Sequence, residues 1–287
     1  MVTALGVDAA LVDGRVERFP LESRPGPGTT WVVVGLDSRA DLPAGTSAAQ
    51  FGTIDQVPGA RADVVLVVHR QAGRTTVLSV PRDLVVGSGR DVDRLALSWL
   101  GGPQHTVDAL CRINIPTDHL VTVDLRGFAA IVDAAGGLDV DIPEPVRDPG
   151  AGLDLPRAGH LHVDGETALA MVRSRHPEHL VDGAWVPVPV DPDGRATAAG
   201  TVLAALAAAA RPSALHPWRL QRLAWAASDA LTIDDGTSPV QLAQLAAVPV
   251  GAVKVLPVSD PVGTVLPRYY THATRDTIAD AGMSCAH

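Results

Sequence analysis

The chain has 287 residues, of which 46% are hydrophobic and 19% charged, and this composition excludes a disordered or fibrous protein. Its 23 basic and 32 acidic side chains leave a net charge of −9, which argues against a nucleic-acid binder held by bulk charge. Lys254 is the only lysine, so arginine is the default basic residue and its abundance alone carries no functional information.

The first half of the chain predicts mainly short strands. Residues 4–21 alternate loosely between apolar and polar and predict one or two strands, and the prolines and glycines of 24–28 predict a turn or linker. Residues 40–59 lack periodicity and predict a loop, whereas 70–73 predict a hairpin turn. The β-branched runs that predict buried strands are 31–34, 64–68 and 75–80.

The second half alternates helices with strands. The predicted helices are 103–111, 125–135, 164–172, 197–211, 217–230, 239–247 and 274–281. The predicted strands are 120–123, 138–142 and 253–258. Several prolines in 176–194 predict a long loop, which in a compact domain is often functional.

This alternation predicts an α/β fold with a mixed central β-sheet flanked by helices. We expect residues 1–28 to form an N-terminal strand and linker that pack on a single domain of residues 29–287. No run of 18 or more apolar residues occurs, and no signal peptide is recognisable.

The two cysteines, Cys111 and Cys285, do not have the CxxC spacing of zinc or redox sites. Two free thiols are the simpler interpretation. One disulfide is the alternative for an exported protein, and the geometry of the fold decides between them.

Aspartates and arginines collect where the predicted elements begin or end. Asp37 and Asp63 lie at the ends of neighbouring strands, and two close carboxylates repel each other unless a cation lies between them. Mg²⁺ takes one or two carboxylates together with water and phosphate oxygens, and the planar fork of arginine binds phosphate. The arginines at these ends are Arg39, Arg61, Arg82, Arg173 and Arg175. The pattern suits a Mg²⁺–pyrophosphate site, and surface ion pairs are the alternative.

Other chemistries have less support in the sequence, which contains no GxSxG, HExxH or Walker-type motif. His160 and His162 would share one face of a strand, but no third ligand is near, so we interpret them as a solvated pair. Trp99 and Trp185 are candidates for stacking on carbohydrate, with packing as the alternative.

In its ordered motifs the sequence resembles the LytR–CpsA–Psr family over roughly residues 30–230. Each motif is weak alone, but the ordered set is specific. The stretches are Val34-Gly-Leu-Asp-Ser-Arg39, Arg61-Ala-Asp63 with Leu78-Ser-Val-Pro-Arg-Asp83, the segment from Gly101 to Val140, and the segment from His160 to Arg175.

The resemblance implies an enzyme that transfers a glycopolymer from a polyprenyl pyrophosphate carrier to peptidoglycan. It also implies a Mg²⁺ cofactor and an apolar lipid tunnel between sheet and helices. Such proteins lie on the extracytoplasmic face of the cell membrane, usually behind an N-terminal anchor helix, so this chain would be an ectodomain without its anchor. The lysine-poor composition is similar to that of actinobacterial proteins, and no nucleic-acid partner is expected.

By motif, Asp37 and Asp63 match the family's Mg²⁺-associated aspartates, and with Arg82 they are the expected catalytic residues. A sugar hydroxyl would attack the phosphorus that bears the glycopolymer, and either aspartate would take the proton or serve only as a metal ligand. The expected pyrophosphate-binding residues are Arg39, Arg61, Arg82, Arg173, Arg175 and Arg195.

Several positions depart from the family pattern. Ala198 and Ala199 stand where an arginine and a glutamine usually follow the position of Arg195, and Arg94 stands near a missing lysine. The alternative function is therefore a non-catalytic module that binds polyprenyl phosphates and regulates wall assembly. An unrelated cytoplasmic protein is a third interpretation, which requires the ordered motifs to be coincidental. The apolar helix 202–210 suits either a lipid-channel wall or a buried core.

Overall fold

The structure is a computed structural model. It describes residues 13–37, 59–87, 92–189, 191, 193–211, 216–248, 253–261 and 267–286. Arg39 and almost all of the loop expected at 40–59 lie outside the described residues.

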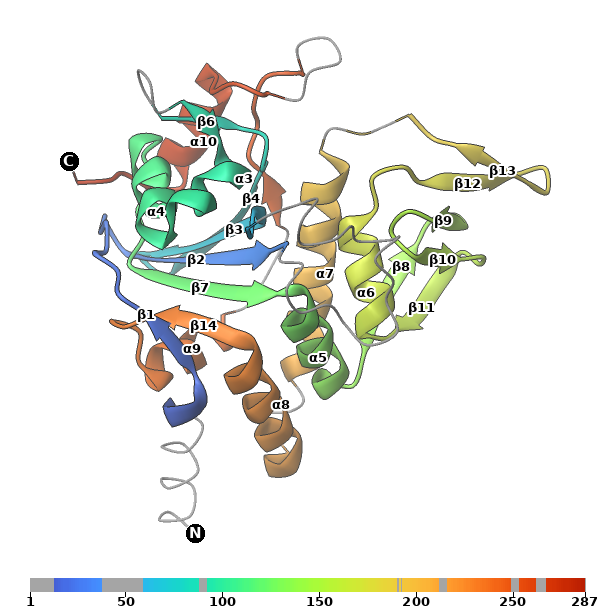
Figure 1. Cartoon of the computed structure of the whole chain (residues 1–287), viewed down its shortest axis with the longest axis horizontal. Coiled ribbons are helices and arrows are strands. Elements are labelled where there is room, and N and C mark those ends of the chain that lie inside the picture. Colours follow the sequence, from blue (N-terminus) through green and yellow to red (C-terminus); the bar gives the residue numbers. More distant parts are fainter. Residues whose placement is uncertain are drawn as a thin grey trace.

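A seven-stranded mixed sheet forms the centre of the molecule (Figure 1). Its strands, in spatial order, are β1 (Glu17–Phe19), β14 (Leu231–Asp234), β7 (His119–Asp124), β2 (Thr29–Leu36), β3 (Ala62–Gln71), β4 (Arg74–Val80) and β15 (Lys254–Val255). β2 pairs with β7 in parallel and with β3 antiparallel, which confirms the predicted mixed sheet. The central strands are rich in valine because both of their faces are covered.

One face of the sheet carries a continuous hydrophobic core. It packs against α3 (Leu95–Ser98), α4 (Pro103–Arg112) and α10 (His272–Asp280), through side chains such as Leu110 and Ile278. A 3₁₀ turn (Trp99–Gly101) and the short pair β5 (Val85–Val86) and β6 (Asp93–Arg94) complete this layer.

The opposite face packs against α7 (Gly194–Ala210) and α9 (Pro239–Ala246), through Leu203, Leu242 and Leu245, and α5 (Leu125–Ala135) and α6 (Gly165–Arg173) pack on one another and on α7. Beyond them lie two small sheets, as Figure 1 shows. One pairs β8 (Leu138–Ile142) with β11 (Gly159–Val163), and the other contains β10 (Leu153–Leu155), β9 (Val146–Asp148), β12 (Glu178–Val181) and β13 (Ala184–Pro187). α8 (Pro217–Ala230) packs on α5, and α9 follows β14.

The predicted helices are confirmed within a few residues, but the long loop expected at 176–194 is wrong. Residues 178–187 form the β12–β13 hairpin. Its two turn residues, Asp182 and Gly183, have φ values of 49° and 81°, as a type I′ turn requires. The Asp-Gly pair was the signal, and the prolines around the strands obscured it. The strand expected at 253–258 is shortened to β15.

Cys111 and Cys285 form a disulfide, with 5.4 Å between their Cα atoms, so the interpretation of two free thiols is wrong. They lie 174 positions apart, and only the packing of α4 beside the C-terminal segment brings them together. Among the described residues, no helix is both long and apolar enough to cross a membrane.

We expect the disulfide to stabilise the fold. The Cys111→Ala/Cys285→Ala variant should lose about 2–5 kcal/mol of unfolding free energy, because the cross-link restricts the unfolded chain. Denaturant titration of the variant beside the unmodified protein measures this loss. Equal midpoints, or free thiols in the denatured but unreduced protein, would contradict the prediction.

Candidate functional site

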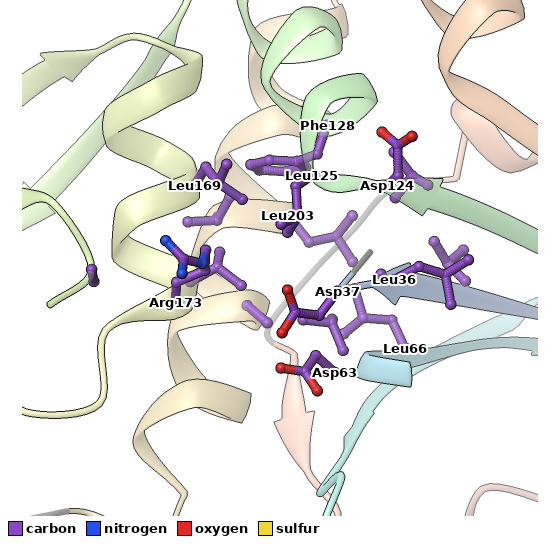
Figure 2. A pocket seen from close by; sticks show the side chains of 18 of the residues that line it. Leu36, Asp37, Asp63, Leu66, Asp124, Leu125, Phe128, Leu169, Arg173 and Leu203 are labelled. Carbon is purple, nitrogen blue, oxygen red and sulfur yellow. The ribbon is translucent and has the colours of Figure 1, made fainter. Parts of the chain in front are cut away.

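A cavity of about 510 Å³ lies between the central sheet and the helices α5, α6 and α7 (Figure 2). Its volume is within the ~300–1,000 Å³ that is usual for ligand sites. Its walls are mainly apolar and come from the sheet and from all three helices. The apolar lining includes Val33, Leu36, Leu66, Leu125, Phe128, Leu169, Val202, Leu203 and Leu206.

Charged side chains meet where β2 and β3 reach this cavity. Figure 2 shows the carboxylates of Asp37 and Asp63 close together, with the guanidinium of Arg173 opposite them on α6. Arg175 and His176, which follow α6, also line the cavity. The cavity therefore combines an apolar chamber with a charged region, as an amphiphilic ligand with an anionic head requires.

A β-bulge places Asp63 on the cavity side of the sheet. The register is Gly35 with Val64, and then Leu36 with Ala62. Asp63 is thus an extra residue of β3. Side chains alternate along a regular strand, so Asp63 would face away from the cavity that its neighbour Val64 lines. Because the bulge changes this alternation, Asp63 lines the same cavity as Asp37.

One carbonyl holds the backbones of both aspartates. The backbone N–H of Asp37 donates to the Arg61 carbonyl at 2.9 Å, and that of Asp63 donates to the same oxygen at 3.0 Å. The Nε of Arg61 is buried and has no hydrogen-bond acceptor among the described residues. A buried guanidinium donor on the residue whose carbonyl holds both aspartates suits a site that receives an anion.

Two arginines pair with Asp63. Arg82 forms a salt bridge with one carboxylate oxygen, and Arg175 lies 3.6 Å from the other. Arg82 also lies 3.5 Å from Asp83, which Arg94 approaches at 3.4 Å. Arg94 thus reaches the site by way of Asp83.

Asp148 fixes the loop after α6, which carries Arg175 and His176. Its Oδ2 accepts hydrogen bonds from the backbone N–H of Arg175 at 2.7 Å and of His176 at 2.8 Å, and from the Ser174 hydroxyl at 2.9 Å. Burial alone would raise the pKa of this carboxyl, but these bonds and one from the Ala151 N–H outweigh burial and lower the pKa. The loop is therefore held by a buried carboxylate.

The site has the donor set of a Mg²⁺ ion bound together with phosphate. Asp37 and Asp63 supply two carboxylates on one side of the cavity. No cluster of three or more His, Cys, Asp or Glu able to hold a metal occurs within the described residues. Mg²⁺ commonly uses one or two carboxylates and completes its shell with water and substrate phosphates, so these two residues fit the ion.

Arg268 lies next to the site and was missed by sequence analysis. It is 5% exposed and pairs with Asp193, which precedes α7. Its Nε donates to the Ser259 carbonyl at 2.8 Å, and its backbone N–H donates to the Asp83 carbonyl at 2.9 Å. No local motif marks it, since packing alone brings it there. It lines a small cavity with Asp63, Arg82 and Ala199.

The remaining predicted residues lie elsewhere or play other parts. Arg195 lies in the first turn of α7, whereas Trp99 packs against Phe19 in the core. Trp185 lies on β13, where the Arg147 guanidinium covers its ring at 4.7 Å. His160 and His162 share the exposed face of β11 and pair across the strands with aspartates at 2.9 Å, which explains them without a metal.

Residues 21–184 match the sequence model of the LytR_cpsA_psr family. The "Probable cell wall biosynthesis protein LcpB" of Corynebacterium glutamicum is 37% identical over 155 residues, which cover 52% of this chain and 36% of that protein. The Bacillus subtilis "Polyisoprenyl-teichoic acid--peptidoglycan teichoic acid transferase TagV" is 34% identical over 127 residues, covering 40% and 32%. The chain thus matches about a third of the length of each relative.

Solved structures share the fold. A "LytR-Csp2A-Psr enzyme from Actinomyces oris" superposes with a TM-score of 0.78 and 35% identity, covering 95% of this chain and 99% of that one. The B. subtilis TagV structure superposes with a TM-score of 0.60 and 22% identity, covering 89% and 97%. The second likeness shows the fold alone.

We expect Asp148→Asn to destabilise the protein by about 2–4 kcal/mol at pH 7, because a neutral amide cannot accept these hydrogen bonds equally well. Because the pKa of Asp148 is lowered in the folded protein, its carboxylate stabilises the fold at pH values above the ordinary aspartate pKa of about 4. This stabilisation is lost as the pH falls through the folded-state pKa. The difference between variant and parent should therefore shrink in acid.

Denaturant titrations at neutral and acidic pH measure this difference, with Asp154→Asn as the control because Asp154 is exposed on neighbouring β10. A pH-independent difference between Asp148→Asn and parent would be inconsistent with the assigned role.

Proposed function

Because the chain belongs to the LytR–CpsA–Psr family, we propose that it transfers a glycopolymer from a polyprenyl pyrophosphate carrier to peptidoglycan. The names of its relatives support a role in cell-wall biosynthesis. The observation that carries the proposal is the apolar cavity with Asp37, Asp63, Arg173 and Arg175 at its charged region. This combination matches the two chemically different parts of a prenyl pyrophosphate.

In this proposal the prenyl chain occupies the apolar chamber as a lipid tunnel. Phe128 of α5, Leu169 of α6 and Leu203 of α7 would contact it. The small side chains of α7, among them Ala199, leave room beside the sheet. Burial of apolar surface would contribute most of the affinity, since it is roughly proportional to the area removed from water.

The pyrophosphate would lie among the arginines. Arg173 and Arg175 extend from the end of α6, and Arg82 faces them from the end of β4. Guanidinium groups bind phosphate oxygens with two parallel hydrogen bonds. Arg61 and Arg195 belong to the same proposed set, as does Arg39, which lies outside the described residues.

In the proposed reaction, a sugar hydroxyl of peptidoglycan attacks the phosphorus that bears the glycopolymer. A new P–O bond forms to this hydroxyl oxygen, and the bond from the same phosphorus to the bridging oxygen breaks. Polyprenyl phosphate leaves with the bridging oxygen. Asp37 or Asp63 accepts the hydroxyl proton, and Arg82 and Arg173 stabilise the charge on the phosphate oxygens.

Asp37 and Asp63 would also hold the proposed Mg²⁺. When bound, the ion would supply positive charge beside the pyrophosphate oxygens. If both carboxylates serve only as metal ligands, the hydroxyl proton passes to solvent instead.

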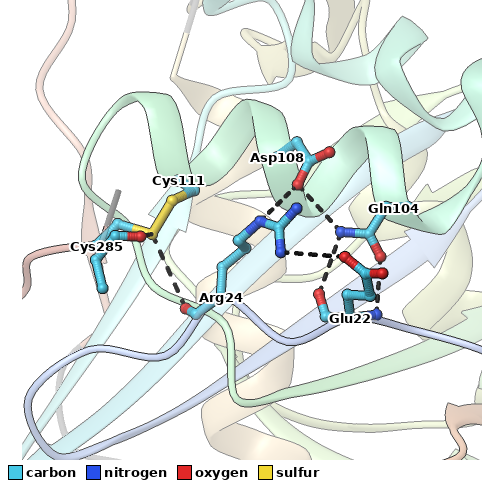
Figure 3. Close-up of a disulfide and its surroundings, with 7 residues drawn as sticks. Glu22, Arg24, Gln104, Asp108, Cys111 and Cys285 are labelled. Atoms are coloured by element: carbon cyan, nitrogen blue, oxygen red, sulfur yellow. Dashed lines mark hydrogen bonds and ion pairs between the residues drawn. A yellow bond between two sulfur atoms is a disulfide. The ribbon is translucent and has the colours of Figure 1, made fainter.

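The disulfide supports a location outside the reducing cytoplasm, because such bonds persist in oxidising compartments. Figure 3 shows Cys285 joined to Cys111 of α4, beside Arg24, whose Nε donates to Asp108 at 2.9 Å. We propose the extracytoplasmic face of the membrane, with an N-terminal anchor as part of the same proposal.

A non-catalytic module that binds polyprenyl phosphates is the second candidate function. Ala198 and Ala199 favour it, because they remove two polar side chains from the start of α7. Arg268 favours the enzyme, because it adds another arginine to the small cavity that Asp63 and Ala199 line.

The test is Mg²⁺-dependent release of phosphate from geranylgeranyl pyrophosphate. We expect Asp37→Ala and Arg82→Ala to lower the rate by about 10²–10³-fold, the usual effect of removing one preorganised group. Arg74→Ala is the matched control, since Arg74 begins the same strand that Arg82 follows and is exposed.

If the unmodified protein binds the lipid tightly but releases no phosphate, the result would contradict the transferase and favour the non-catalytic binding module. If the unmodified protein neither releases phosphate nor binds the lipid, both candidate functions are contradicted.

A further inference from the structure

The first turn of α8 extends into solvent. Trp218 is 71% exposed, the highest value among the large hydrophobic residues described, and Leu220 is 48% exposed. Arg219, between them, is also exposed. These three side chains point in widely different directions around a helix, so their shared exposure means that the helix end projects beyond the body. Figure 1 shows α8 at the lower edge of the molecule.

In the sequence, this projecting end belongs to a basic stretch of an acidic chain. No aspartate or glutamate occurs between Asp193 and Asp229, whereas the whole chain has a net charge of −9. The exposed arginines of this part are Arg211, Arg219 and Arg222. None of them forms an ion pair within the described residues.

The rest of α8 is firmly held. Gly127 of α5 lies so close to Ala230 that an added Cβ would come within 2.7 Å of the alanine Cβ. On another side, the Arg15 guanidinium lies 4.5 Å from the centre of the Trp225 ring and its Nε donates to Asp229 at 3.0 Å. The exposure of Trp218 is therefore built into the fold.

We propose that the tip of α8, defined as Trp218, Arg219 and Leu220 together with Arg222, binds an anionic lipid surface. Tryptophan favours the boundary between headgroups and hydrocarbon, and a neighbouring leucine inserts beside it. Arginines bind anionic headgroups, whereas the net negative charge of the chain is repelled from them. Attraction of these arginines and repulsion of the rest of the chain would together orient the tip toward the lipid.

The tip is linked to the large cavity through the fold. α8 packs on α5, which supplies Leu125 and Phe128 to the cavity wall, and Leu231, the residue after α8, lines the same cavity. Lipid binding by the tip would therefore orient this wall relative to the membrane. The proposal stands without the proposed transferase activity, because it rests on exposure and charge alone.

The test is sedimentation of the purified chain with vesicles of phosphatidylcholine alone or of equal parts phosphatidylcholine and phosphatidylglycerol. We expect binding to the anionic vesicles that weakens as salt is added. Trp218→Ser/Leu220→Ser should lower the partition coefficient at least about tenfold, since both apolar anchors are removed. Val240→Ser is the matched control, because Val240 is 66% exposed on α9.

A second pair of variants tests the charge. Arg219→Glu/Arg222→Glu should abolish the preference for anionic vesicles, whereas Arg112→Glu, at the exposed end of α4, should preserve it. Circular dichroism checks that each variant is folded.

Three results would overturn the proposal: no binding by the unmodified protein, equal binding to neutral vesicles, or unchanged binding by both α8 variants. If the unmodified protein forms dimers and the Trp218→Ser/Leu220→Ser variant is monomeric, the tip binds a second copy of the chain instead.

Discussion

The site depends on one extra residue in the pairing of β2 with β3. The bulge turns Asp63 toward the cavity that Asp37 already lines, and a single Arg61 carbonyl holds both backbones. Without the bulge, alternation along the strand would place the two carboxylates on opposite faces of the sheet. Arg82 and Arg175 pair with Asp63 only in this arrangement, so the charges of two strands and one helix end converge at one point.

The remaining layers give this point its chemical setting. The first face of the sheet is filled by α3, α4 and α10, which makes a rigid support. The second face retains a cavity because α7 contributes small side chains, such as Ala199 and Val202, where α5, α6 and the sheet meet. Asp148 then holds the loop after α6, so that the arginines lie at the border between charged and apolar surface.

Most of the fold could be predicted from local patterns. The helix 125–135 and the strand 138–142 were predicted to the residue, because strong periodicity and the Gly136-Gly137 stop coincide there. The ordered motifs predicted Asp37, Asp63, Arg82 and Arg173 as one set. Three features depended on long-range packing, which spacing does not report: the bulge, the approach of Arg268, and the disulfide. The β12–β13 hairpin was missed for a different reason, since its Asp-Gly turn was present in the sequence but surrounded by prolines.

The most direct test is a crystal structure of the protein with geranylgeranyl pyrophosphate and Mn²⁺, whose anomalous signal locates the ion. We expect the prenyl chain along Phe128 and Leu203, the pyrophosphate within hydrogen-bond distance of Arg173, and the ion at both Asp37 and Asp63. A lipid bound outside this cavity, or an ion held away from the paired carboxylates, would contradict the assignment of the site.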